Sequence, residues 1–137
     1  MNKVFQYLSQ DRINQLLSPN LKLGKRVGNT NIYQSGKILI GYAESKLYEE
    51  KNEYWYSLFI DTYKEKSIND ICLCLQNKGI LLLKLNFLLG IKNILYTKEY
   101  PTGLRYNIYI KEEDKKYYLC NTKNKQGINL TKFFTPA

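Results

Sequence analysis

An acidic residue and a lysine stand two positions apart at Glu44 and Lys46, at the end of an apolar run. In a β-strand, side chains two positions apart point to the same face. A carboxylate and a lysine on one face can bind Mg²⁺ and steady an attacking water or a phosphate, which is the chemistry of metal-dependent phosphodiester cleavage. The pair is therefore one candidate for a catalytic centre.

This spacing resembles the acidic residue and lysine of the PD-(D/E)XK nucleases, which also need a partner acid on an earlier neighbouring strand. Upstream of Glu44 the only carboxylate is Asp11, within a predicted helix, and Asp61 follows the next apolar run. A Mg²⁺-dependent nuclease centred on Glu44 and Lys46 is therefore kept as a secondary hypothesis. We expect a protein without catalysis of its own and with no resident metal or cofactor.

Histidine is absent, which excludes HNH-type nucleases, zinc deaminases and Ser-His-Asp hydrolases. Cys72, Cys74 and Cys120 supply only three soft ligands, fewer than a structural zinc site needs. Cys72 and Cys74 alternate at strand spacing, and we expect them to pack as small hydrophobic side chains. An odd number of cysteines without paired spacing favours reduced thiols and a cytoplasmic location.

The chain carries 21 basic and 12 acidic residues, a net charge of +9. Such an excess attracts polyanions, nucleic acids above all. AT-rich coding also enriches lysine over arginine, so the charge alone leaves a functional and a compositional explanation open. The only arginines are Arg12, Arg26 and Arg105, which limits bidentate reading of guanine and predicts slight or shape-based sequence specificity.

Cations and aromatic residues near predicted loops and strand ends are candidates for phosphate and base contacts. These nucleic-acid-binding candidates are Lys25, Arg26, Lys37, Ser45, Lys46, Tyr48 and Arg105. The single tryptophan, Trp55, stands between Tyr54 and Tyr56 in an apolar run. We expect Trp55 to face the core and the two tyrosines to face the other way.

The elements that must position these residues are one N-terminal helix and a series of short strands. Helical spacing of apolar residues predicts a helix over 3–17, ended by Ser18-Pro19, and residues 21–31 are loop-like. The runs 37–43 and 54–60 predict a hairpin whose acidic tip contains Glu49, Glu50 and Glu53. Two further hairpins are predicted over 71–83 and 105–121, a short helix over 85–90 and a last helical turn over 129–134.

No repeat or linker divides the chain, so residues 1–137 are predicted to form one α+β domain. Its helical N-terminus, 3–17, packs on a mostly antiparallel sheet in a sheet-rich body over 30–134. No apolar run approaches the roughly 20 residues that a membrane-spanning helix needs, so no membrane partner is expected.

Several short motifs resemble a compact domain of prokaryotic restriction–modification-like and mobile-element proteins. Ser45-Lys46-x-Tyr48 is followed by Tyr54–Tyr56, the paired runs ICLCLQNKGILLL, the strand RYNIYI, Tyr117–Leu119 and the closing Asn129–Phe133. The similarity covers roughly residues 30–134 and implies DNA recognition rather than catalysis. This chain has Ile60-Asp61 where such domains have a His-Pro-like step, and Lys84 where they have proline, so roles of those positions do not carry over.

The leading hypothesis is a DNA-binding module of a restriction, defence or counter-defence system. A hypothesis of another class is a small protein-binding factor, such as a phage inhibitor of a host enzyme. Its partner would bind the tyrosine-rich face or the acidic hairpin tip.

Overall fold

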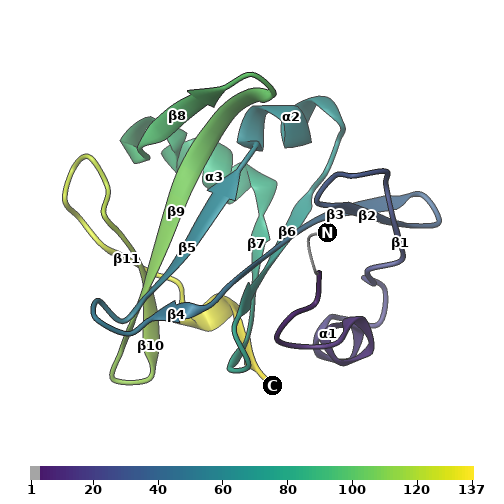
Figure 1. Cartoon of the computed structure of the whole chain (residues 1–137), viewed down its shortest axis with the longest axis horizontal. Helices are drawn as coiled ribbons and strands as arrows, with labels where there is room; N and C mark the ends of the chain where they lie inside the picture. The colour runs from purple at the N-terminus through teal and green to yellow at the C-terminus, as the bar shows by residue number, and fades with distance from the viewer. Residues whose placement is uncertain (1–3) are drawn as a thin grey trace.

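The computed structural model describes residues 4–137, which form an α+β domain with two β-sheets (Figure 1). The first sheet has the order β1-β2-β3-β6-β7-β12: β1 Lys25–Arg26, β2 Ile32–Ser35, β3 Ile38–Ser45, β6 Asp70–Leu75, β7 Gly79–Lys84 and β12 Phe134–Pro136. The second has the order β11-β10-β9-β5-β4: β11 Ile128–Asn129, β10 Lys116–Cys120, β9 Gly103–Glu113, β5 Glu53–Leu58 and β4 Leu47–Tyr48. Strand β8, Thr97–Tyr100, also pairs with β9. Only β3 and β6 pair in parallel among the described strands.

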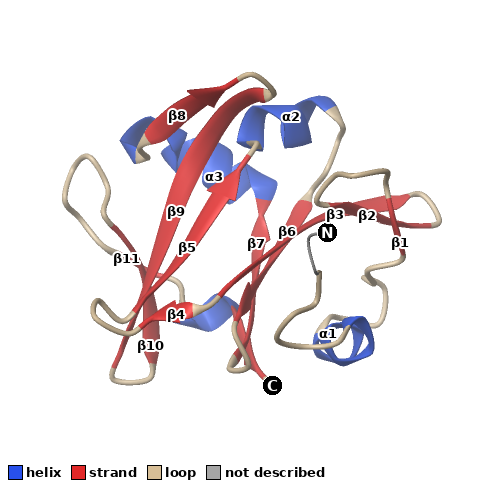
Figure 2. Cartoon of the chain, in the orientation of Figure 1, coloured by secondary structure: helices blue, strands red, loops and turns tan. Residues whose placement is uncertain are grey.

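The main core lies between the two sheets. Tyr54, Tyr56 and Leu58 of β5 are buried there together with Leu73 of β6 and Ile108 of β9. Burying such large apolar side chains is the dominant stabilising contribution to a domain of this size. The helices α2, Ile60–Glu65, and α3, Leu85–Ile91, lie at one end of the sheets (Figure 2). Two 3₁₀ turns follow at Lys92–Ile94 and Thr131–Phe133.

A second core lies on the opposite face of the first sheet. Helix α1, Gln10–Leu16, contributes Ile13 to a cluster that includes Leu17, Tyr42, Cys72 and Cys74. The N-terminal segment, the first sheet and the second sheet therefore stack as three layers. This arrangement covers both faces of the first sheet.

The predicted helix over 3–17 is too long. Residue 3 lies outside the described residues, and α1 begins only at Gln10, where the Ser9 hydroxyl accepts a hydrogen bond from the Arg12 amide (3.1 Å). That interaction caps the helix, because the first amides of a helix have no partner within it. The segment before Ser9 bends instead, and Phe5 has a positive φ of 59°.

The predicted hairpin of 37–43 with 54–60 is also wrong. These runs form β3 and β5, which belong to different sheets, and β5 pairs instead with the two-residue β4 and with β9. Ile60 begins α2 rather than ending a strand. The local sequence does not indicate these strand partners, because β5 pairs with the distant β9 and β3 pairs with the distant β6.

Other predictions agree with the structure. The hairpins β6–β7 and β9–β10, the helix α3 and the turn at Thr131–Phe133 all form, and Cys72 and Cys74 are buried free thiols. Strand β1 forms within the segment predicted as loop, and β8 and α2 were not predicted. In the part of the chain that the structure describes, no helix has the length and apolar character to cross a membrane.

Candidate nucleic-acid interface

The outer face of the second sheet carries the exposed aromatic residues. Along β9, Tyr106 and Ile108 are buried whereas Arg105, Asn107 and Tyr109 are partly exposed, as strand alternation requires. The residue of β5 that pairs with Tyr109 is Trp55. Among the described residues no further sheet covers this face, whereas the first sheet has the second sheet on one face and the N-terminal segment on the other.

Trp55 lies on this outer face with 38% of its surface exposed, so the prediction that it faces the core is wrong. Its neighbours Tyr54 and Tyr56 are the buried residues, at 0% and 4% exposure. Tyr56 can be buried because its hydroxyl donates a hydrogen bond to the Cys74 carbonyl (2.7 Å), which satisfies its polar end. The side chains of β5 alternate between the two faces of the sheet, and Tyr54 and Tyr56 occupy the face that packs in the core.

An aromatic cluster surrounds Trp55. The Tyr48 ring stacks on the Trp55 ring with centroids 4.0 Å apart and an angle of 18°, and Tyr109 meets it edge-on at 5.9 Å and 86°. Lys46 Nζ lies 4.9 Å from the centroid of Tyr48, and Lys51 Nζ lies 5.7 Å from that of Trp55. We call Lys46, Tyr48, Lys51, Trp55 and Tyr109 the aromatic–basic face. Within residues 4–137, neither lysine forms an ion pair.

Buried polar groups fix the orientation of this cluster. Ser45 is only 6% exposed, and its Oγ accepts a hydrogen bond from the Trp55 amide (2.9 Å) and donates one to the Lys46 carbonyl (2.7 Å). Ser45 therefore positions the face from beneath rather than presenting its hydroxyl to solvent. Such satisfied buried groups rigidify their neighbours.

The predicted acidic tip is only partly solvated. Glu49 and Glu50 are exposed, but Glu53 is buried, and its Oε1 accepts hydrogen bonds from Trp55 Nε1 (3.0 Å) and Asn121 Nδ2 (3.1 Å). The carboxylate of Glu53 thus holds the indole ring and the start of the 121–127 loop in place. Its role is to orient Trp55.

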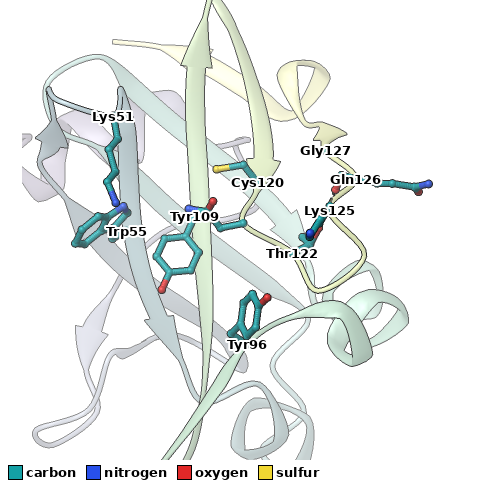
Figure 3. Close-up of a pocket in the computed structure, with 10 residues that line it drawn as sticks. Lys51, Trp55, Tyr96, Tyr109, Cys120, Thr122, Lys125, Gln126 and Gly127 are labelled. Atoms are coloured by element: carbon teal, nitrogen blue, oxygen red, sulfur yellow. Dashed lines mark hydrogen bonds between the residues drawn. The ribbon is translucent and has the colours of Figure 1, made fainter.

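A pocket of about 650 Å³ opens between Trp55 and the 121–127 loop (Figure 3). Three aromatic residues, Trp55, Tyr96 and Tyr109, line it together with Lys51 and Lys125. Figure 3 shows Lys51 lying along Trp55 and Gln126 pointing away from the pocket. Aromatic rings beside ammonium groups suit a planar, negatively charged ligand such as a nucleotide.

The residues predicted from the sequence did not include Lys51, Tyr96, Tyr109 or Lys125. Tyr96 is 47% exposed and immediately precedes β8, a strand that the sequence did not predict, so its place beside Trp55 had no local signal. Lys125 belongs to the 121–127 loop, which reaches the pocket because β10 and β11 pair on either side of it. Lys51 could have been identified from the sequence, because it is a lysine four residues before the only tryptophan.

A second concave area of about 600 Å³ lies on the other side of Trp55. It is lined by Lys46, Tyr48, Lys51, Trp55 and Gln76, among others. Because Trp55 and Lys51 line both pockets, the two form adjoining parts of one surface. Of the sequence-predicted residues, the structure brings Lys46 and Tyr48 together here.

The remaining candidates lie elsewhere. Arg26 and Arg105 line a separate cleft of about 510 Å³ at the α2 end of the sheets. Lys25 is exposed on β1, and Lys37 is exposed in the turn between β2 and β3; neither lines that cleft or the aromatic–basic face. The predicted residues therefore do not form one continuous patch.

Glu44 is engaged within the protein. Its Oε2 accepts a hydrogen bond from the Tyr42 hydroxyl (2.8 Å) and its Oε1 accepts one from the Gln6 amide (3.2 Å). Burial raises the pKa of Tyr42, and the negative charges of Cys74 and Glu44 raise it further. Asp61 accepts hydrogen bonds from Tyr106 (2.9 Å) and Lys92 (3.3 Å) instead. Over residues 4–137, no three His, Cys, Asp or Glu side chains gather as metal ligands would.

No family model, curated protein or solved structure matches this chain.

Proposed function

We propose that the chain is a DNA-binding module that holds a single-stranded segment on its aromatic–basic face, without catalysis of its own. The observation that carries this proposal is the exposed Trp55, stacked on Tyr48 and flanked by Lys46 and Lys51. Proteins that bind single strands combine aromatic rings, on which bases stack, with cations that neutralise phosphates. A sheet surface of this kind suits unpaired bases better than a duplex, whose bases are already stacked.

The pocket beside Trp55 supports the proposal further. Trp55, Tyr96 and Tyr109 offer ring faces and edges, while Lys51 and Lys125 stand where the charge of a phosphate would be neutralised. Base stacking on an aromatic side chain is sequence-tolerant, since every base has a π-face. We therefore propose broad rather than strict sequence preference.

We further propose service in a restriction, defence or counter-defence system, on the motif resemblance described above. Ser45, Lys46 and Tyr48, which carry that resemblance, converge on Trp55. The motif residues thus meet at the surface for which we propose binding.

A second candidate function is binding to a basic protein partner. The exposed Glu49 and Glu50 adjoin the same aromatic residues, and both line the pocket with Tyr48 and Trp55. In this case a nuclease-treated lysate would still yield a stoichiometric complex, and purified DNA would not compete with the partner.

The direct test is fluorescence anisotropy of labelled oligonucleotides, single-stranded and duplex, titrated with the protein. We expect the single strand to bind more tightly, and its affinity to fall steeply between ~50 and ~200 mM salt as counterion release becomes less favourable. Because Trp55 is the only tryptophan, its fluorescence should be quenched as a base stacks on it. Affinity that stays flat over this salt range, or an unquenched tryptophan, would contradict the proposal.

A further inference from the structure

A second cationic site lies at the α2 end of the sheets, apart from the aromatic–basic face. Its cleft of about 510 Å³ is bounded by the turn before β2, by α2 and by the turn between β8 and β9. Three cations, Arg26, Lys66 and Arg105, line it. None of the described residues that line the cleft is acidic.

Arg105 lies between two aromatic rings in this cleft. Its guanidinium carbon lies 4.6 Å from the ring centroid of Phe59 and 4.4 Å from that of Tyr100, so two aromatic rings flank the charged group. Its Nε is buried and has no hydrogen-bond partner within residues 4–137. A buried donor without a partner is costly, and few occur in native proteins. Because Arg105 is partly exposed and lines the cleft, an anionic ligand bound there would neutralise its charge.

The guanidinium of Arg26 is also oriented by a contact within the protein. Its Nε donates a hydrogen bond to the Thr30 carbonyl (2.8 Å), which orients the guanidinium and leaves both terminal nitrogens without a hydrogen bond to the described residues. Lys66 is exposed at the end of α2, and in the described part of the chain none of the three cations forms an ion pair. Burial raises the pKa of Tyr63 in the same cleft, the nearby charge of Arg105 lowers it by less, and the net pKa is about 12.

We infer that this cleft binds a phosphate monoester. Guanidinium groups donate paired hydrogen bonds to phosphate oxygens, and an ammonium group adds a further charge. The hydroxyls of Thr62 and Thr102 lie in the same cleft and can also donate. Three uncompensated cations suit the charge of roughly −1.5 to −2 on a monoester at neutral pH better than the single charge of a phosphodiester.

The cleft connects with the proposed DNA-binding surface. Arg26 and Asn31 also line a depression of about 250 Å³ that reaches Ser57 and Trp55. Arg105 and Tyr109 lie on the same face of β9, four residues apart, which corresponds to roughly 13 Å along a strand. A strand whose terminal phosphate occupies the cleft would therefore extend towards Trp55. The inference that the phosphate belongs to the end of a DNA strand, rather than to a free small molecule, rests on the proposed function.

Inorganic phosphate is the first probe, titrated into the labelled protein and followed by amide NMR spectra. We expect the amides of the cleft to shift, and the affinity to fall about 10-fold in R26Q, as expected for loss of hydrogen bonds to a charged group. The variant K66Q changes an exposed side chain, so it preserves the fold and should also weaken binding several-fold. The matched control K64Q alters an exposed lysine of the same helix that does not line the cleft. Equal phosphate affinity in all four proteins would overturn the inference.

Oligonucleotides with a 5′-phosphate, a 3′-phosphate or two hydroxyl ends distinguish the two sources. We expect one phosphorylated end to bind about 10-fold more tightly than the hydroxyl end, and R26Q to abolish this advantage. If phosphate binds in the cleft but all three oligonucleotides bind equally, the ligand is a free small phosphate. If W55A abolishes oligonucleotide binding and no phosphate enters the cleft, the proposed function stands and the cleft inference fails.

Discussion

The Trp55 amide donates a hydrogen bond to Ser45 Oγ across 2.9 Å, which ties the strand of the second sheet that carries the exposed tryptophan to the end of a strand in the first sheet. The same hydroxyl donates to the Lys46 carbonyl (2.7 Å). One buried side chain therefore sets both the position of the indole and the path of the chain through Lys46.

Replacing Ser45 with alanine should destabilise the protein by about 1–3 kcal/mol, because the partly buried amide of Trp55 loses its acceptor. Urea unfolding followed by Trp55 fluorescence measures this loss. The control is S35A, since the Ser35 hydroxyl makes no hydrogen bond to a described residue and its removal should cost less than about 0.5 kcal/mol. Equal stability of the two variants would show that the contact does not matter.

Replacing Trp55 with alanine should weaken single-strand binding about 10-fold or more, since stacking on one base contributes about 1–3 kcal/mol. The indole lies outside the core, so circular dichroism should show an unchanged fold. The matched control is I38A, which removes another exposed hydrophobic side chain, at the start of β3 beside the β2–β3 turn of the first sheet. Comparable weakening in I38A would argue against a stacking role.

Replacing both Lys46 and Lys51 with glutamine should flatten the salt dependence of binding. Each phosphate contact to a single strand contributes about 0.7 to the slope of log affinity against log salt, so two lost contacts should reduce it by roughly 1.4. Anisotropy titrations at several salt concentrations give this slope. An unchanged slope with weaker binding would mean that these lysines act only by orienting the aromatic rings.

The stability of the protein should fall at alkaline pH. Burial raises the pKa of Cys74 from 9.0 to about 11, and it also raises that of Cys72. As the pH rises, the Cys74 thiol therefore loses its proton in the unfolded chain before it does so in the folded protein. The folded state keeps its full stability below about pH 9 and loses part of it as the pH rises towards 11. Urea midpoints between pH 7 and pH 11 measure the effect. The variant C74A should show a shallower decline, and an identical decline would contradict this assignment.

Replacing Glu44 with alanine separates a structural role from the nuclease hypothesis. The Tyr42 hydroxyl loses its carboxylate acceptor, and we expect a destabilisation of about 1–3 kcal/mol, with E49A as the exposed control. Incubation with plasmid and Mg²⁺ should give the same result for wild type and E44A. Cleavage by the wild type that E44A abolishes would instead favour a metal-dependent nuclease.

The sequence predicted those parts of the fold that local contacts determine. ICLCLQNKGILLL forms a hairpin because its two apolar runs flank a turn, and Gly79 takes a positive φ of 153° within it. Alternation also required Trp55 to oppose Tyr54 and Tyr56. Which side of β5 faces the core depends on packing against Ile108 and Leu73, which belong to strands distant in sequence. The prediction that Trp55 faces the core was therefore wrong.

The candidate site shows the same division. Lys46 and Tyr48 are two residues apart and lie together, as strand spacing indicates. The pairing of Arg26 with Arg105 in one cleft depends on the position of the β8–β9 turn relative to β1, for which no short stretch of sequence carries information. Lys25 and Lys37 were predicted from residue type alone, and in the structure they lie outside both the cleft and the aromatic–basic face.

The division of strands between the two sheets also has a consequence for the folding reaction. Strands β6 and β7 are neighbours in sequence and close a short loop, whereas β5 pairs with β9 across the long segment between Leu58 and Gly103. Closing the longer loop costs more chain entropy and slows folding. We therefore expect the first sheet to gain protection from hydrogen exchange early in refolding. The surface that displays Trp55 would form last, and an emerging chain would be unable to capture a ligand before its interior is complete.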